Sequence, residues 1–170
     1  MSKAGRVPVL HHGRLAIWES LAIMEYLAET FPEKHLWPKA VAARGLARSV
    51  ANEMHAGFSA LRNACPMNLR RPVKPVPMSD AAHADVSRIE SIWRECRTRY
   101  GKGGKFLFGK FGIADAMYAP VATRFHTYGV DLDKVSAAYR DTILALPAMR
   151  QWYADASAER EVIDEFEQRV

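Results

Sequence analysis

The chain has 170 residues, of which 49% are hydrophobic and 25% are charged, with a net charge of +5. This composition is typical of a globular protein and excludes a disordered or fibrous chain. Its apolar runs fall short of the ~20 residues of a membrane span, and no signal-peptide pattern opens it, so we expect a cytoplasmic protein without a membrane partner.

The cysteines and the placement of charge indicate the cellular compartment and the kind of ligand to expect. Cys65 and Cys96 form no Cys-x-x-Cys motif and no metal-like cluster, which suits a reducing compartment and predicts no metal. Residues 157–170 hold five acidic residues against two arginines, so the positive charge is concentrated on the preceding part of the chain. Such a field attracts anionic small molecules. Because no helix carries a basic stripe and no recognised binding motif is present, we expect no nucleic-acid partner.

The first predicted elements are two short strands and a helix within residues 7–27. The apolar runs 7–10 and 15–18 flank a turn containing Gly13, which predicts a β-hairpin. A helix follows, with Ser20 as its expected N-cap. Pro8 lies inside a strand-like run, where proline removes a ladder donor. A cis Val7–Pro8 bond explains this proline and leaves the backbone of Val7 as a docking edge for an extended ligand.

Glu19 and Ser20 stand at the start of this helix, where free N–H groups and the helix dipole favour an anion. We expect a bound carboxylate to accept hydrogen bonds from the Ser20 hydroxyl and N–H, while Glu19 holds a neighbouring ammonium. That pairing suits an amino-acid head group. The alternative is an ordinary capped helix with an acidic first turn.

Taken together, residues 7–10 and 19–27 resemble the second half of the glutathione-binding domain of glutathione S-transferases. The resemblance implies that Val7, before the cis Pro8, binds the cysteinyl backbone of glutathione and that Glu19 and Ser20 bind its γ-glutamyl end. In that family a strand, a helix and another strand come first and supply the catalytic Ser, Tyr or Cys. We therefore expect the native gene to begin upstream of Met1; the alternative is that this chain covers its open strand edge in another way.

The chain is predicted to consist of two domains joined by a linker. Residues 1–31 are predicted to form a partial thioredoxin-like unit, residues 32–38 a linker, and residues 39–170 an all-α domain, so the expected fold class is α+β and mainly α. Trp37 is expected to fill the seam between the two parts. One long helix is predicted over residues 41–65, because its apolar residues recur at steps of three and four: Leu46, Val50, Met54, Phe58, Leu61 and Cys65.

Glu53 and His55, within that helix, resemble the corresponding residues of bacterial beta-class transferases. The resemblance implies that Glu53 reaches across a dimer to the γ-glutamyl amine and that His55 lies near the sulfur. A histidine can bond to a thiol, or help to deprotonate it, near neutral pH. The alternative for His55 is an ordinary surface position.

Four further helices are predicted in the second half. One begins near residues 79–80; one covers 133–144; and one has Pro147 in its first turn. Residues 109–120 resemble the buried capping-box helix of transferases, with Asp115 present but glycine at the cap position. An acidic tail, 159–170, has helical propensity.

The resemblance implies an enzyme that binds glutathione as substrate and conjugates its thiolate to a small electrophile, working as a homodimer. We expect an electrophile pocket lined by Phe58, Arg62, Met117 and Tyr118, with core packing or a solvated charge as the alternative for these residues. The competing hypothesis is a non-catalytic transferase-like module that binds a ligand or another protein. It is motivated by the absent strands and the exposed hairpin edge.

Overall fold

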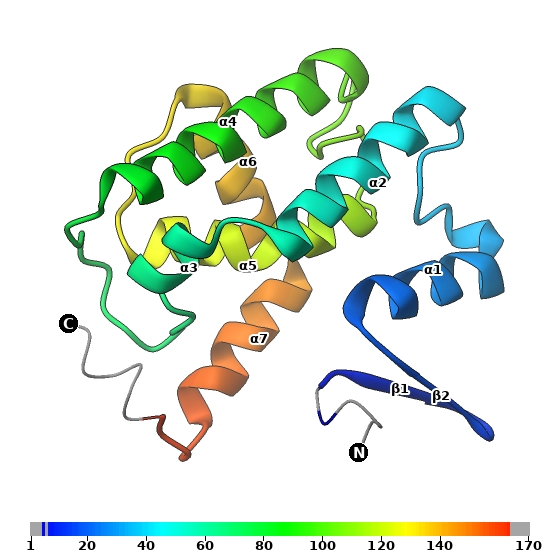
Figure 1. The fold of residues 1–170 in the computed structure, drawn as a ribbon, viewed down its shortest axis with the longest axis horizontal. Coiled ribbons are helices and arrows are strands. Elements are labelled where there is room, and N and C mark those ends of the chain that lie inside the picture. Colours follow the sequence, from blue (N-terminus) through cyan, green and yellow to red (C-terminus); the bar gives the residue numbers. More distant parts are fainter. Residues whose placement is uncertain (1–4, 6, 164–170) are drawn as a thin grey trace.

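The computed structural model describes residues 5 and 7–163 and divides into a hairpin unit and a helical body (Figure 1). The hairpin unit contains β1 (Val9–His12), β2 (Leu15–Trp18) and α1 (Ser20–Thr30). The two strands are antiparallel, with Val9 opposite Trp18 and His12 opposite Leu15. A short 3-10 helix, η1 (Pro32–Lys34), leads into the body. The predicted fold class, mainly helical with one β-hairpin, is confirmed.

The helical body consists, in its described part, of α2 (Val41–Ala56), α3 (Ser59–Ala64), α4 (Asp80–Tyr100), α5 (Ile113–Thr127), α6 (Lys134–Leu144) and α7 (Pro147–Ala158). Helix α5 packs against both α2 and α6, and α3 packs against α4 (Figure 1). Most residues of α5 are buried, so this helix forms the centre of the body. The other elements are arranged around it.

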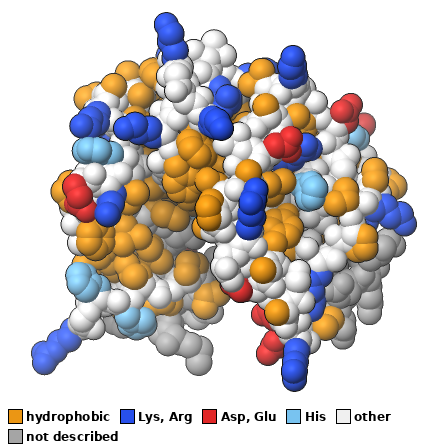
Figure 2. All heavy atoms as spheres, turned by 180° about the vertical axis from the view of Figure 1, so that it is seen from behind, with side chains coloured by type: hydrophobic (Ala, Val, Ile, Leu, Met, Phe, Trp, Pro, Cys, Tyr) orange, Lys and Arg blue, Asp and Glu red, His pale blue; other side chains and the backbone are white. Residues whose placement is uncertain are grey.

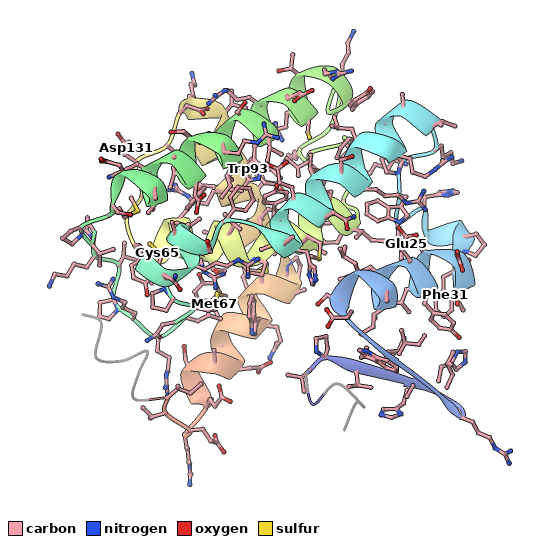
Figure 3. The ribbon with its side chains drawn as sticks, viewed as in Figure 1. Glu25, Phe31, Cys65, Met67, Trp93 and Asp131 are labelled. Carbon is pink, nitrogen blue, oxygen red and sulfur yellow. The ribbon has the colours of Figure 1, made fainter. Side chains whose placement is uncertain are left out.

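An aromatic cluster joins the helices of the body. The indole of Trp93, on α4, is fully buried and meets three other rings edge-on, at centroid distances of 5.9 Å (Tyr118), 5.4 Å (Phe125) and 4.7 Å (Tyr139). Figure 3 shows Trp93 in the middle of the body. Edge-to-face packing adds to the free energy gained by burying rings of this size.

Asp115 organises the start of α5. Its carboxylate accepts hydrogen bonds from the N–H of Gly112 (3.0 Å), the N–H of Leu107 (3.0 Å) and the hydroxyl of Tyr139 (2.9 Å). The first of these bonds is half of the capping box that the sequence predicted; glycine has no side chain to supply the other half. A buried carboxylate with three donors is stable in the core, because its polar atoms are satisfied.

The structure differs from the predicted elements in four places. The first strand, expected over residues 7–10, runs over Val9–His12, so that His11 and His12 belong to the strand and not to the turn. The helix expected over 41–65 is two helices, separated at Gly57 and Phe58, where Phe58 has φ +62°. Helix α1 has Glu19, not Ser20, as its N-cap, and no side chain caps it. In the acidic tail, residues 159–163 are not helical, and residues 164–170 lie outside the described part of the chain.

The hairpin unit is much less buried than the body. No residue of β1, β2 or α1 is fully buried, and Leu15 and Trp18 are among the exposed large hydrophobic side chains. Seen from behind, hydrophobic side chains gather over the side of the molecule where the hairpin unit lies (Figure 2). The unit is attached to α2 by a two-pronged ion pair, in which Arg48 donates to both oxygens of Glu25 at 2.9 and 3.0 Å. Trp37 is buried at this seam, as predicted.

Candidate functional site

The hairpin brings the residues of the predicted glutathione site together. Because Val9 lies opposite Trp18, the chain entering β1 and the chain leaving β2 run side by side, and this places Val7 and Pro8 close to the start of α1. The Val7–Pro8 bond is cis, as predicted. Val7 is 91% exposed, so its backbone is open to an extended ligand.

Glu19 lies at the junction of β2 and α1 in an uncommon backbone conformation, with φ +71° and ψ 125°. A non-glycine residue with positive φ costs free energy, and residues strained in this way are enriched at functional sites. Ser20 is the first residue of α1, so its N–H is among the free donors of the helix N-terminus. No acidic residue lies in the first turn of α1 to interact with these free N–H groups.

The glutamate of this pair faces a histidine from the helical body. Nε2 of His55, in the last turn of α2, lies 3.5 Å from Oε2 of Glu19. Both side chains are more than 40% exposed, so the contact is at the surface, open to solvent and ligands. Two residues that the sequence nominated from different domains therefore meet at one place. Their separation of 36 positions hid this contact from any local pattern.

Glu53 lies on the same helix as His55 but has a partner within the chain. Arg88 of α4 donates to both carboxylate oxygens of Glu53, at 2.7 and 2.9 Å. A bidentate pair of this kind fixes the orientation of both side chains. Sequence reasoning missed Arg88, because helix periodicity does not reveal which side chain on another helix a carboxylate will meet.

Phe58 and Arg62 stand where α2 ends and α3 begins. Phe58 is 8% exposed and belongs to the core. The guanidinium of Arg62 donates to the carbonyls of Met54 (2.6 Å) and Gly57 (3.1 Å), and so binds the carboxyl end of α2. A cation at this position also interacts favourably with the helix dipole. Arg62 is half-buried and already engaged with the backbone.

Met117 and Tyr118 are both part of the core. Met117 is 8% exposed. Tyr118 is fully buried, and its hydroxyl donates to the carbonyl of Val50 on α2 at 3.2 Å. Burial raises the pKa of the Tyr118 phenol above its ordinary value, so the side chain is neutral at physiological pH. In the described structure, the alternative of core packing fits Tyr118.

Neither cysteine has the environment of a nucleophile. Cys65 and Cys96 are completely buried. Burial raises the pKa of the Cys65 thiol to about 11 and that of Cys96 to about 12. Because the thiolate is the reactive form, both side chains are inert at neutral pH. Neither Cys65 nor Cys96 therefore supplies a reactive thiolate at the hairpin.

The arrangement offers three kinds of contact to an amino-acid-like ligand: an exposed strand backbone at Val7, free helix N–H groups at Ser20, and a carboxylate at Glu19. Among the described residues, no three His, Cys, Asp or Glu side chains gather closely enough to hold a metal ion. Nor is any described helix both long and apolar enough to cross a membrane.

Two family models match the chain. "Glutathione S-transferase, C-terminal domain" matches residues 79–155, and "Glutathione S-transferase, N-terminal domain" matches residues 1–29. Among curated proteins, Glutathione S-transferase 1 of Dianthus caryophyllus is 31% identical over 139 residues, covering 78% of this chain and 60% of the relative. Maleylacetoacetate isomerase of Rattus norvegicus is 27% identical over 128 residues, covering 75% and 57%. The chain thus spans about 60% of the length of these relatives.

Solved structures agree with the fold. A glutathione transferase homolog from Burkholderia, with bound glutathione, superimposes with a TM-score of 0.68 at 25% identity, over 93% of this chain and 76% of that one. A homolog from Lodderomyces elongisporus, with two GSH per subunit, gives 0.64 at 20% identity, over 89% and 76%. With a matching family model at each of the hairpin unit and the helical body, and a shared fold across both, the chain belongs to the glutathione S-transferase family.

Proposed function

We propose that the hairpin unit binds glutathione and that the protein conjugates the glutathione thiolate to a small electrophile. The observation that carries this proposal is the junction of β2 and α1, where Glu19 is held at positive φ with its carboxylate at the surface and Ser20 begins an uncapped helix. The glutathione bound to the Burkholderia homolog supports the choice of ligand.

Each part of glutathione has a proposed partner. The γ-glutamyl carboxylate accepts hydrogen bonds from the Ser20 hydroxyl and N–H, its ammonium pairs with Glu19, and the cysteinyl backbone pairs with Val7 as an added strand. His55, beside Glu19, is the proposed partner of the thiol. A histidine there stabilises the thiolate, which is the attacking species. Glu53 is proposed to orient the amine end from a second copy of the chain in a homodimer.

Calorimetric titration with glutathione tests the binding step. We expect the affinity to fall by about 10- to 100-fold in Glu19→Gln/Ser20→Ala, because an ion pair and a charge-assisted hydrogen bond are lost. Glu29→Gln/Ser49→Ala is the matched control, since it makes the same two chemical changes at exposed positions away from the junction. Equal affinities for the two double variants would refute the proposed site.

A second function is favoured by the state of the cysteines and of Tyr118. All three side chains are buried and protonated at neutral pH. Among these described residues, His55 therefore remains as the group proposed to activate the thiol of glutathione. The alternative proposal is a module that binds glutathione without turnover. Conjugation of 1-chloro-2,4-dinitrobenzene separates the two: the enzyme shows a rate that His55→Gln lowers, and the module shows the uncatalysed rate with either sequence.

A further inference from the structure

Arg62, on α3, lies beside the turn of α2 that carries His55. Its guanidinium donates to the carbonyls of Met54 and Gly57, one on each side of His55 in the chain. The dimensions of the backbone therefore place the guanidinium within about 10 Å of the imidazole. Since His55 is the proposed partner of the thiol, Arg62 is within reach of a small electrophile that the thiol attacks.

Arg124, on α5, lies next to Arg62. It donates through Nε to the carbonyl of Cys65 at 2.9 Å and through Nη1 to that of Pro120 at 3.1 Å. Cys65 directly follows α3 and is about one helical turn from Arg62, so the two guanidinium groups meet at this short helix. Burial and repulsion from Arg62 both lower the pKa of Arg124, which agrees with a short separation of like charges.

These two positive charges have no acidic partner among the described residues. Neither Arg62 nor Arg124 forms an ion pair there, in contrast to Arg48 and Arg88, each of which is held by a glutamate. Nη1 of Arg62 and Nη2 of Arg124 donate to no described residue. Both side chains are half-buried, so water screens their charge less than at the surface. This arginine pair, Arg62 and Arg124, is therefore suited to binding an anion.

Given the proposed function, on which this step rests, we propose that the electrophile carries a carboxylate, which binds to the arginine pair while the reactive carbon lies at the thiol of glutathione. During conjugation, the sulfur forms a bond to that carbon, the leaving group departs with the electrons of the bond that breaks, and the thiol proton passes to His55. The carboxylate takes no part in these changes. Arg62 and Arg124 position it through charge-assisted hydrogen bonds, and so select anionic electrophiles over neutral ones.

The test uses two conjugates of glutathione that differ in charge, so it does not require turnover. S-(4-carboxybenzyl)glutathione carries the carboxylate, and S-(4-carbamoylbenzyl)glutathione carries a neutral amide of similar shape. We expect calorimetric titration of the full chain to show at least about tenfold tighter binding of the carboxylate. In Arg62→Gln/Arg124→Gln this preference should vanish. Arg62→Lys/Arg124→Lys keeps both charges and should retain part of it.

The matched control is Arg44→Gln/Arg97→Gln. Both of these arginines also donate to backbone carbonyls, but they lie near the start of α2 and in the last turn of α4. This variant should keep the preference of the parent chain. Because the two affinities are compared within each variant, a general loss of stability lowers both and leaves their ratio unchanged. If the double variant at the arginine pair does not fold, Arg62→Gln and Arg124→Gln alone supply the ratio.

The results also distinguish a failure at the arginine pair from a failure of the proposed function. Equal affinity of the parent chain for the two conjugates would overturn the arginine pair as the carboxylate site and leave the glutathione site standing. A preference that persists in Arg62→Gln/Arg124→Gln would overturn it as well. A parent chain that binds neither conjugate nor glutathione would overturn the proposed function, and the carboxylate site with it.

Discussion

Glu19 combines the most unusual backbone of the candidate site with its acidic side chain. Its φ of +71° is in the range where an L-residue is strained and glycine is not. Such strain costs about 1–3 kcal/mol and persists where the surrounding structure enforces it. The side chain faces His55 rather than a capping position of α1, so the strain brings no local hydrogen bond in return.

Replacing Glu19 with glycine should change the free energy of unfolding and the affinity for glutathione in opposite directions. Glu19→Gly should raise the free energy of unfolding by up to about 1 kcal/mol, since glycine adopts positive φ freely. The same variant should lose glutathione affinity, because it has no carboxylate. Urea unfolding measures the change in stability, and calorimetry measures the change in glutathione affinity. The control is Glu29→Gly, at negative φ inside α1, which is expected to lower the free energy of unfolding. A destabilised Glu19→Gly would contradict the assignment of strain.

The reactivity of the two cysteine thiols tests whether they are buried as the structure shows. With pKa values near 11 and 12 and no exposed surface, Cys65 and Cys96 should not react with a disulfide reagent at pH 7.5 in the folded protein. In 6 M guanidinium both should react within minutes. Rapid labelling of one thiol in the folded chain would show that the core around α3 or α4 opens easily.

At the scale of elements, the break between α2 and α3 is where hydrophobic periodicity failed. The apolar stripe continues through Phe58 and Cys65, and both residues are indeed buried. Periodicity therefore predicted the correct core residues but a single helix. The backbone approaches itself closely at the break: a Cβ on Gly57 would lie 2.7 Å from the carbonyl oxygen of Glu53. That is a local contact which a pattern of polar and apolar residues does not report.

This contact makes Gly57→Ala a destabilising change. The added carbon requires the backbone to move, at an expected cost of about 1–3 kcal/mol. Gly45→Ala is the matched control, because Gly45 lies inside α2 with open space around it, and alanine there should stabilise the helix by up to about 1 kcal/mol. Thermal unfolding of the two variants should shift in opposite directions. Shifts of the same sign would argue against the close approach.

The starts of α4 and α7 were predicted correctly from a capping serine and a proline, whereas Ser20 proved not to cap α1. Ser79 caps α4 by accepting from the N–H of Ala82 at 3.3 Å, and Pro147 begins α7. The cis bond before Pro8 was predicted because proline has so few places in a strand. What sequence did not reveal was pairing across helices, as between Glu53 and Arg88 or Tyr118 and Val50, since these depend on how the helices pack.

Asp133, the N-cap residue of α6, makes the stability of the fold depend on pH. Asp133 accepts from the N–H groups of Val135 and Ser136 and pairs with Arg94 at 2.5 Å. Burial acts to raise the pKa of this carboxyl, but the hydrogen bonds from Ser136 and Arg94 outweigh it and hold the pKa below its usual value. An acid with a lowered pKa stabilises the fold above its unfolded pKa, and this stabilisation is lost as the pH falls.

Asp133→Ala should therefore cost about 1–2 kcal/mol at pH 7, and the cost should shrink below about pH 4. Urea unfolding at both pH values measures it. Asp131→Ala, on the exposed loop just before the cap (Figure 3), should change stability by less than about 0.5 kcal/mol at either pH. A penalty for Asp133→Ala that does not vary with pH would rule out the charged form as its source.

At the scale of the whole molecule, the chain has one well-buried core and one lightly buried unit. The body is held by the aromatic cluster around Trp93, which draws on α4, α5 and α6. In its described part, the hairpin unit has no fully buried residue, and it joins the body through the seam at Trp37 and the ion pair of Glu25 with Arg48. An exposed ion pair of this kind contributes little, typically below about 1 kcal/mol.

Amide hydrogen exchange should reveal this division. Amides of α1 should exchange at least about 100-fold faster than the slowest amides of α5, because they need only the seam to open, whereas α5 requires the core to unfold. Arg48→Gln should speed exchange in α1 and leave α4 and α5 unchanged. Glutathione should slow exchange in β1, β2 and α1 selectively, since a ligand stabilises the state that binds it. If all helices exchanged at one rate, the hairpin unit and the body would be a single cooperative unit, and ligand binding at the hairpin would stabilise the whole chain equally.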